Sequence, residues 1–211
     1  MNKIDIDKLY SNAEKNYELK EFKKAFESYL ILAEAGFSDA QVIVGKMYFS
    51  GSGVSENFDL FLNWYEKAAN NGSSHAQVYL SRKYFHEKVF DKSIELCELA
   101  VENNYSSAIR LKGTLLENGC YGEENKSKAL QFFKKSSEMG NILAMKSYAR
   151  LLWKEKKILF GLLWYLKYIF NIRKFMKEYK KIYSGDDDSF FNSFNGELLY
   201  GTNSIDNKLG H

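Results

Sequence analysis

The sequence predicts an all-α protein, an α-solenoid built from helix–turn–helix repeats. Three observations lead to this fold class: a recurring alanine, a recurring helix-ending glycine or asparagine with the same spacing, and a chain of 211 residues without proline. Proteins rich in strands and loops normally use proline in their turns. Apolar residues make up 45% of the chain and charged residues 27%, which is the balance of an ordinary folded domain.

The first helix opens on an alanine in four of the predicted repeats. Residues at offsets 0, 5 and 8 from it share one side of a helix, and offset 5 always holds a small residue. We expect the small residues to let a neighbouring helix approach closely. The alanines are Ala40, Ala76, Ala108 and Ala144, spaced by 36, 32 and 36 residues, and the small residues are Gly45, Ser81, Gly113 and Ala149.

A second helix is predicted after each first helix, most clearly over 60–72. There LFLNWYEKAANNG places Trp64 and Tyr65 on a buried stripe, and Gly72 ends the helix. Glycine and asparagine tolerate the left-handed conformation of a helix end. Because the stops repeat the 36, 32 and 36 spacing of the alanines, the two features indicate true internal repeats. The stops are Gly36, Gly72, Asn104 and Gly140, and the other second helices are expected over 25–36, 93–104, 129–140 and 161–171.

These residues resemble the Sel-one-like repeat (SLR) family, a branch of the tetratricopeptide-like helical repeats. Segment 40–72 follows the family pattern A-x4-[LG]-x2-Y-x2-G-x-G-V, then K-A-x2-W-Y-x-K-A-A-x2-G, at most positions, and 108–140 keeps much of it. Segments 76–107 and 144–171 lack the Gly-x-Gly loop and are closer to plain tetratricopeptide units. The resemblance implies antiparallel helix pairs stacked in a right-handed superhelix. It also implies a non-catalytic scaffold or adaptor, bacterial in origin, that holds a partner protein or peptide.

The repeats divide the chain into a solenoid and a tail. We expect a solenoid over 1–183 that ends in a capping helix, followed by an acidic, loosely ordered tail over 184–211. The tail aromatics, among them Phe190 and Phe194, either dock back on the array or form a recognition peptide. The expected units are 3–36, 37–72, 73–104, 105–140 and 141–171, with the cap over 172–183.

The predicted binding surface is the concave groove lined by the first helices. In repeats of this kind the first helix of each pair lines the concave face. In this chain the exposed positions of those helices hold mostly basic and aromatic residues. Arginine binds carboxylates through two hydrogen bonds and aromatic rings pack on apolar side chains, so an extended, acidic peptide is the expected partner. The competing interpretation is that these are ordinary solvated cations. The groove residues are Lys46, Phe49, Arg82, Phe85, Arg110, Lys146, Arg150 and Trp153.

Charge concentrates in one segment and suggests an alternative function. Residues 150–181 hold ten Lys or Arg and two acids, a balance of +8 in a chain of net charge +3. The basic, aromatic segment 154–183 could make the protein a peripheral membrane regulator. Against this, Trp164 and Lys167 follow Trp64 and Lys67 by 100 residues, which assigns much of the apolar surface to the solenoid core. No nucleic-acid partner is expected, because the rest of the chain is slightly acidic.

No residue pattern predicts catalysis, a cofactor or a metal site. The three histidines share no helix face, and the Gly-x-Gly at 51–53 follows a helix rather than the strand of a phosphate-binding loop. Cys97 is expected in the core and Cys120 as an exposed free thiol. We expect a cytoplasmic protein, since there is no signal-like segment and the apolar run 158–170 is shorter than the ~20 residues that span a bilayer. The oligomeric state stays open.

Overall fold

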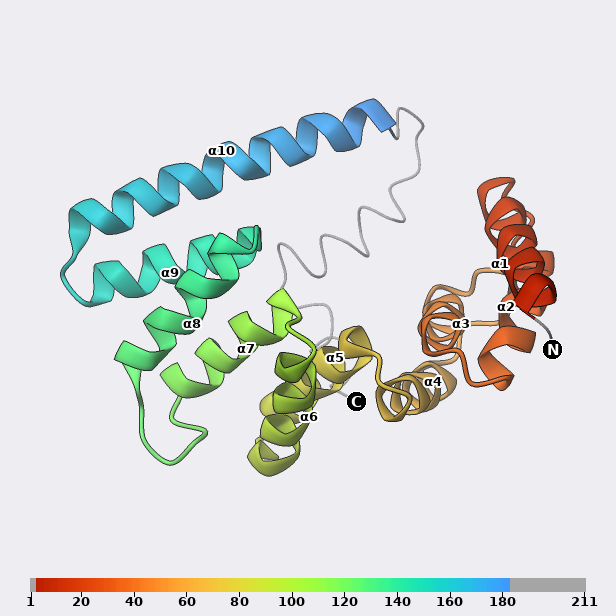
Figure 1. The fold of residues 1–211 in the computed structure, drawn as a ribbon, viewed down its shortest axis with the longest axis horizontal. Coiled ribbons are helices and arrows are strands. Elements are labelled where there is room, and N and C mark those ends of the chain that lie inside the picture. Colours follow the sequence, from red (N-terminus) through yellow and green to blue (C-terminus); the bar gives the residue numbers. More distant parts are fainter. Residues whose placement is uncertain (1–2, 183–211) are drawn as a thin grey trace. The chain divides into compact units, whose positions relative to one another are not determined.

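The computed structural model describes residues 3–182 and the burial of side chains 5–177. Within these residues the chain forms ten α-helices and no strand, which confirms the predicted all-α solenoid (Figure 1). The C-terminal tail expected over 184–211 lies outside the described residues. The helices are α1 (Lys3–Glu18), α2 (Phe22–Glu34), α3 (Ser38–Ser50), α4 (Phe58–Asn70), α5 (Ser74–His86), α6 (Phe90–Glu102), α7 (Ser106–Glu117), α8 (Lys126–Glu138), α9 (Ile142–Lys154) and α10 (Ile158–Ile182).

The chain divides into two compact units, and the boundary falls inside α8, after Phe132. In the first unit each helix packs on the next, from α1 on α2 to α6 on α7, and the first helices α5 and α7 also contact each other. In the second unit α9 packs along α10. A helix pair cannot bury its apolar face alone, so neighbouring pairs complete one another's cores.

The helices end at the predicted stops. All four stop residues have a left-handed backbone, with φ from +53° to +93°. Two of the helices that follow a stop are capped by a side chain: Ser73 Oγ accepts the N–H of Ala76 at 3.4 Å, and Asn141 Oδ1 accepts the N–H of Ala144 at 2.9 Å. These caps satisfy backbone donors that the first turn of a helix leaves unpaired. The stops are Gly36, Gly72, Asn104 and Gly140.

Turns inside the helix pairs alternate between two kinds. The longer connections of α3–α4 and α7–α8 use the left-handed glycines Gly51 and Gly119. The shorter connections of α1–α2, α5–α6 and α9–α10 instead place a lysine in the left-handed region, with φ of 59° to 61°. Sequence reasoning missed these turns because lysine carries no turn signal. The left-handed conformation costs a residue other than glycine about 1–2 kcal/mol. The lysines are Lys20, Lys88 and Lys156.

Small residues bring the helices of each pair together, as predicted. The four opening alanines are fully buried. A Cβ atom at Gly45 would lie 2.8 Å from the ring of Tyr65, so α4 approaches α3 where only hydrogen fits. In the next pair the hydroxyl of Ser81 donates to the carbonyl of Ser93 (2.6 Å), and the hydroxyl of Ser93 donates back to the carbonyl of Ser81 (2.8 Å). The reciprocal bonds satisfy two buried hydroxyls without separating the helices.

The last helix differs from the sequence expectation. A second helix over 161–171 and a separate capping helix over 172–183 were expected, but α10 is continuous from Ile158 to Ile182. No proline or glycine interrupts the segment after Gly161, so nothing in the chain ends the helix at Asn171. The cap is therefore an extension of the second helix of the last pair.

The two cysteines occupy different environments. Three apolar clusters follow one another along the first unit, and the third, which includes Val78 and Leu111, is called the third core cluster; Cys97 is fully buried in it, as predicted. Burial raises the pKa of its thiol to about 12. The expectation of an exposed Cys120 is wrong: its side chain is half-buried and packs against the same cluster, and burial raises its pKa as well.

A substitution at Gly53 tests how the loop between α3 and α4 packs against the start of α2. Its φ is +75°, and an added Cβ would collide with the backbone carbonyl of Phe22, at the start of α2. Gly53→Ala should lower the free energy of unfolding by at least about 3 kcal/mol, from conformational strain plus the clash. Gly36→Ala is the matched control, because Gly36 has φ of +93° but open space around it; it should cost about 1–2 kcal/mol. Equal losses in urea titrations would contradict the close approach.

Thiol labelling tests the core position of Cys97. Only the thiolate reacts, and a pKa near 12 leaves almost none of it at a pH of about 8. In a Cys120→Ser variant we expect Cys97 to react with a disulfide reagent only as fast as the protein unfolds, and at once in denaturant. In a Cys97→Ser variant Cys120 should react faster under native conditions. Rapid native labelling of Cys97 would show that the third core cluster is open.

Candidate functional site

Five of the eight predicted groove residues lie in the first unit, on its first helices. Lys46 and Phe49 belong to α3, Arg82 and Phe85 to α5, and Arg110 to α7. We call these five residues the first-helix surface. The direct contact between α5 and α7 makes the first helices of successive repeats neighbours there.

The cations of the first-helix surface differ in exposure. Lys46 is exposed, whereas Arg82 and Arg110 are half-buried. Arg82 lies close enough to Tyr79 for its charge to lower the pKa of the phenol, although burial dominates and raises that pKa to about 12. Tyr79 thus stays neutral, and the positive charge is not offset by a phenolate. Guanidinium groups held by packing offer hydrogen bonds to an anion at a smaller loss of side-chain entropy.

The aromatic residues of this surface also serve the core. The ring of Phe49 lies 5.1 Å from that of Phe61 and 6.4 Å from that of Phe58. The ring of Phe85 lies 6.2 Å from that of Phe90 and packs against the third core cluster. Both side chains are half-buried, so each presents only part of its ring. They can pack beside a bound segment but cannot wrap around it.

The other three predicted residues lie on α9, in the second unit. Lys146, Arg150 and Trp153 are exposed. The indole N–H of Trp153 donates to the carbonyl of Ile158 (3.2 Å), and its ring lies 5.2 Å from that of Tyr165. Trp153 therefore closes the turn between α9 and α10, a structural role that the sequence did not predict.

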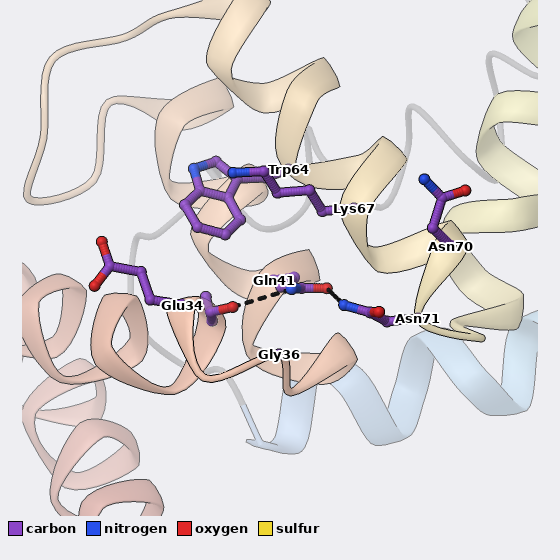
Figure 2. Close-up of a pocket in the computed structure, with 8 residues that line it drawn as sticks. Glu34, Gly36, Gln41, Trp64, Lys67, Asn70 and Asn71 are labelled. Atoms are coloured by element: carbon purple, nitrogen blue, oxygen red, sulfur yellow. Dashed lines mark hydrogen bonds between the residues drawn. The ribbon is translucent and has the colours of Figure 1, made fainter.

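An open pocket of about 460 Å³ lies where α2, α3 and α4 meet (Figure 2). Buried Gln41 donates from Nε2 to the carbonyl of Ala33 and accepts from Nδ2 of Asn71, each at 3.0 Å. On another wall the ammonium of Lys67 lies 4.1 Å from the ring centroid of Trp64. The lining residues are Ala33, Glu34, Gly36, Gln41, Trp64, Lys67, Asn70 and Asn71.

The glutamine of this pocket recurs one repeat later. Gln77 donates to the carbonyl of Ala69 (3.1 Å) as Gln41 does to that of Ala33, but its buried Oε1 meets no hydrogen-bond donor among the described residues. The signal was present in the sequence, since Gln follows the opening alanine in both repeats. The Gln41 amide links three helices, so the pocket is primarily a junction between repeats.

A polar cluster holds the loop between α7 and α8. The carboxylate of Glu98, on α6, accepts from the ammonium of Lys112 (2.6 Å) and from the hydroxyl of Tyr121 (2.5 Å). Burial, followed by the bond to Glu98, raises the pKa of Tyr121, which therefore remains a donor. Sequence reasoning missed this cluster because its members are 14 and 23 residues apart.

Neither a metal centre nor a membrane span occurs in the part of the chain that the structure describes. No group of three or more His, Cys, Asp or Glu side chains there could hold a metal ion. No described helix is both long enough and apolar enough to cross a membrane.

Solved structures share this architecture. A Sel1 repeat protein from Oxalobacter formigenes matches with a TM-score of 0.64 and 24% identity over 71% of this chain and 62% of its own length. A protective antigen of uropathogenic Escherichia coli strains that displays an SLR fold matches with a TM-score of 0.64 and 19% identity over 76% of this chain. The chain thus spans 62% and 38% of the lengths of these two proteins. At these identities the match concerns the fold.

The sequence itself matches the model of the Sel1 repeat twice. The matched segments are 38–73, which holds α3 and α4, and 113–141, which holds the end of α7 and all of α8. They are the two segments in which a long loop with two left-handed glycines is followed by a glycine stop; the glycines are Gly51 and Gly53 in one loop and Gly119 and Gly122 in the other. In these two segments the chain matches Sel1 repeats, and it shares its fold with solved Sel1 repeat proteins.

Proposed function

We propose that this protein is a non-catalytic scaffold that holds an extended, acidic segment of a partner protein on the first-helix surface. Sel1 repeat proteins are generally protein-interaction scaffolds. The observation that carries the finer proposal is the placement of Lys46, Arg82 and Arg110 on three successive first helices. The proposed setting is the bacterial cytoplasm, which the composition and the family resemblance favour.

The chemistry of the first-helix surface favours a carboxylate-bearing segment over a small molecule. Its cations come from α3, α5 and α7, so one ligand can meet all of them only if it extends across several repeats. The guanidinium groups of half-buried Arg82 and Arg110 can donate charge-assisted hydrogen bonds to carboxylates. Beside them, the partly exposed rings of Phe49 and Phe85 offer apolar contact. The competing interpretation, solvated cations without a ligand, predicts no preference for acidic segments.

A second candidate function, attachment to a membrane surface, is favoured by α10. Most of its exposed side chains from Ile158 to Phe170 are large and apolar, with exposed fractions of 45% to 69%. Large apolar patches of this kind mark surfaces that bind proteins or membranes. This function would use the second unit and leave the first-helix surface to a protein partner.

Peptide selection tests the scaffold proposal and does not require the partner to be identified. The immobilised chain should enrich, from displayed random dodecapeptides, sequences with several Asp or Glu residues and at least one apolar residue. Lys46→Glu/Arg82→Glu should weaken binding of the enriched peptides by at least about tenfold, because it replaces attraction by repulsion at two contacts. Fluorescence anisotropy with synthetic peptides measures the change.

The matched control reverses two exposed lysines on second helices of the same unit, Lys23→Glu/Lys128→Glu. It makes the same change in net charge and should leave binding within about twofold. Thermal unfolding of both variants checks that replacing half-buried Arg82 has not destabilised the fold. Enrichment without an acidic preference, or equal loss in both variants, would refute the first-helix surface as the binding site.

A further inference from the structure

The outward side of α10 carries an apolar stripe that the repeat architecture does not need. We call Leu159, Leu163, Leu166 and Phe170 the outer stripe; their exposed fractions are 68%, 56%, 55% and 69%. The spacing of four, three and four residues places them on one line along the helix. The packed side of α10 is a different one, where Trp164 contacts Tyr148 and Tyr168 is buried.

Comparison with two other second helices, α4 and α8, shows that they lack this stripe. The same repeat positions, 100 residues earlier in α4 and 32 residues earlier in α8, are exposed and polar. In α4 and α8 these positions do not pack against a following repeat. The stripe is therefore not a core face that is exposed only because α10 belongs to the last repeat. In α4 the positions hold Asp59, Asn63, Glu66 and Asn70, and in α8 they hold Ser127, Gln131, Lys134 and Glu138.

Cations surround the stripe at both ends. Arg173 and Lys177 are exposed and continue its line after Phe170 at spacings of three and four residues. Lys156 and Lys157 are exposed in the turn that precedes α10. Lys167 lies at the side of the stripe, with its ammonium 4.4 Å from the ring centroid of Trp164. Between positions 154 and 177 the sequence contains one acid, Glu155.

The cations around the outer stripe favour a lipid surface over a second copy of this chain as its binding partner. Two copies paired antiparallel through the stripe would bring Arg173 and Lys177 of one toward the turn before α10 of the other, where Lys156 and Lys157 outnumber the single acid Glu155. Parallel pairing would set cations against cations. Protein interfaces are also depleted in lysine, whereas lysines at the ends of an apolar helical face can reach lipid phosphates while their stems stay among apolar groups.

We infer that the outer stripe of α10 is a docking site for the surface of a bilayer containing anionic lipid. The inference rests on the second candidate function above and names its site and its ligand. The leucines and Phe170 insert at the level of the acyl chains, and Arg173, Lys177 and the preceding lysines meet the phosphates. The apolar part spans about 20 Å, so the helix lies along the surface.

Vesicle flotation tests this site. The full chain should float with vesicles of phosphatidylcholine and about one third phosphatidylglycerol and stay behind with pure phosphatidylcholine. Leu163→Asn/Leu166→Glu, which copies Asn63 and Glu66 of α4, should reduce the bound fraction by at least about tenfold. Arg173→Gln/Lys177→Gln should reduce it by a similar factor and weaken its dependence on salt.

Matched controls separate the site from general effects of charge and folding. Lys128→Gln/Lys135→Gln removes two exposed cations from α8 and should leave flotation unchanged. Because Leu163 and Leu166 are exposed, the stripe variant should keep the helical circular dichroism and melting temperature of the wild type. If its melting temperature falls, Leu163→Gln alone serves as a milder variant with the same expected direction of effect.

Each result decides the question differently. Flotation of the wild type that is lost in the stripe variant and in the α10 cation variant supports the site. Flotation that the stripe variant retains overturns the site and leaves membrane attachment standing. If the wild type does not float with anionic vesicles, both the proposed site and membrane attachment are refuted. A wild type that is dimeric in analytical ultracentrifugation and becomes monomeric in the stripe variant, without binding vesicles, would assign the stripe to self-association instead.

Discussion

The close approach of the two helices inside each pair is the constraint on which the fold depends. An alanine that is fully buried opens four of the first helices, and offset 5 holds a residue no larger than serine. Where that residue is Gly45, the ring of Tyr65 occupies the space of a side chain; where it is Ser81, two hydroxyls bond across the gap. A larger residue at either place would push the pair apart and expose the core that it shares with its neighbours.

The connections follow from that packing. A pair held so closely must turn sharply, and a sharp turn places one residue in the left-handed region. Longer loops satisfy this with Gly51 and Gly119, and the shorter ones with lysines that accept some strain. Gly53 has a further role, because its missing side chain lets the loop lie against the start of α2. The Gly-x-Gly motif is thus a device for joining repeats rather than for binding phosphate.

The two units present surfaces of different chemistry. The first-helix surface offers half-buried guanidinium groups and partly covered rings, which suit an anionic protein segment. The outer stripe of α10 offers exposed leucines bordered by lysines, which suit a lipid surface. A protein with both would bring a bound partner to a membrane, and either surface could still act without the other.

The sequence alone determined the fold class, the repeat rhythm and the helix ends, because small residues and left-handed stops act locally and recur with a period. It also indicated that Trp64, Tyr65 and Cys97 belong to the core. It could not predict the Gln41 and Glu98 bonds, which join residues far apart in the chain. It missed the lysine turns because lysine carries no turn signal, and the continuity of α10 although no proline or glycine interrupts the segment after Gly161. Only the tertiary structure decided which apolar residues remain exposed: Trp153 closes a turn, while Leu159, Leu163, Leu166 and Phe170 face outward. All of them are large apolar residues, and burial is settled by which neighbour packs against each face.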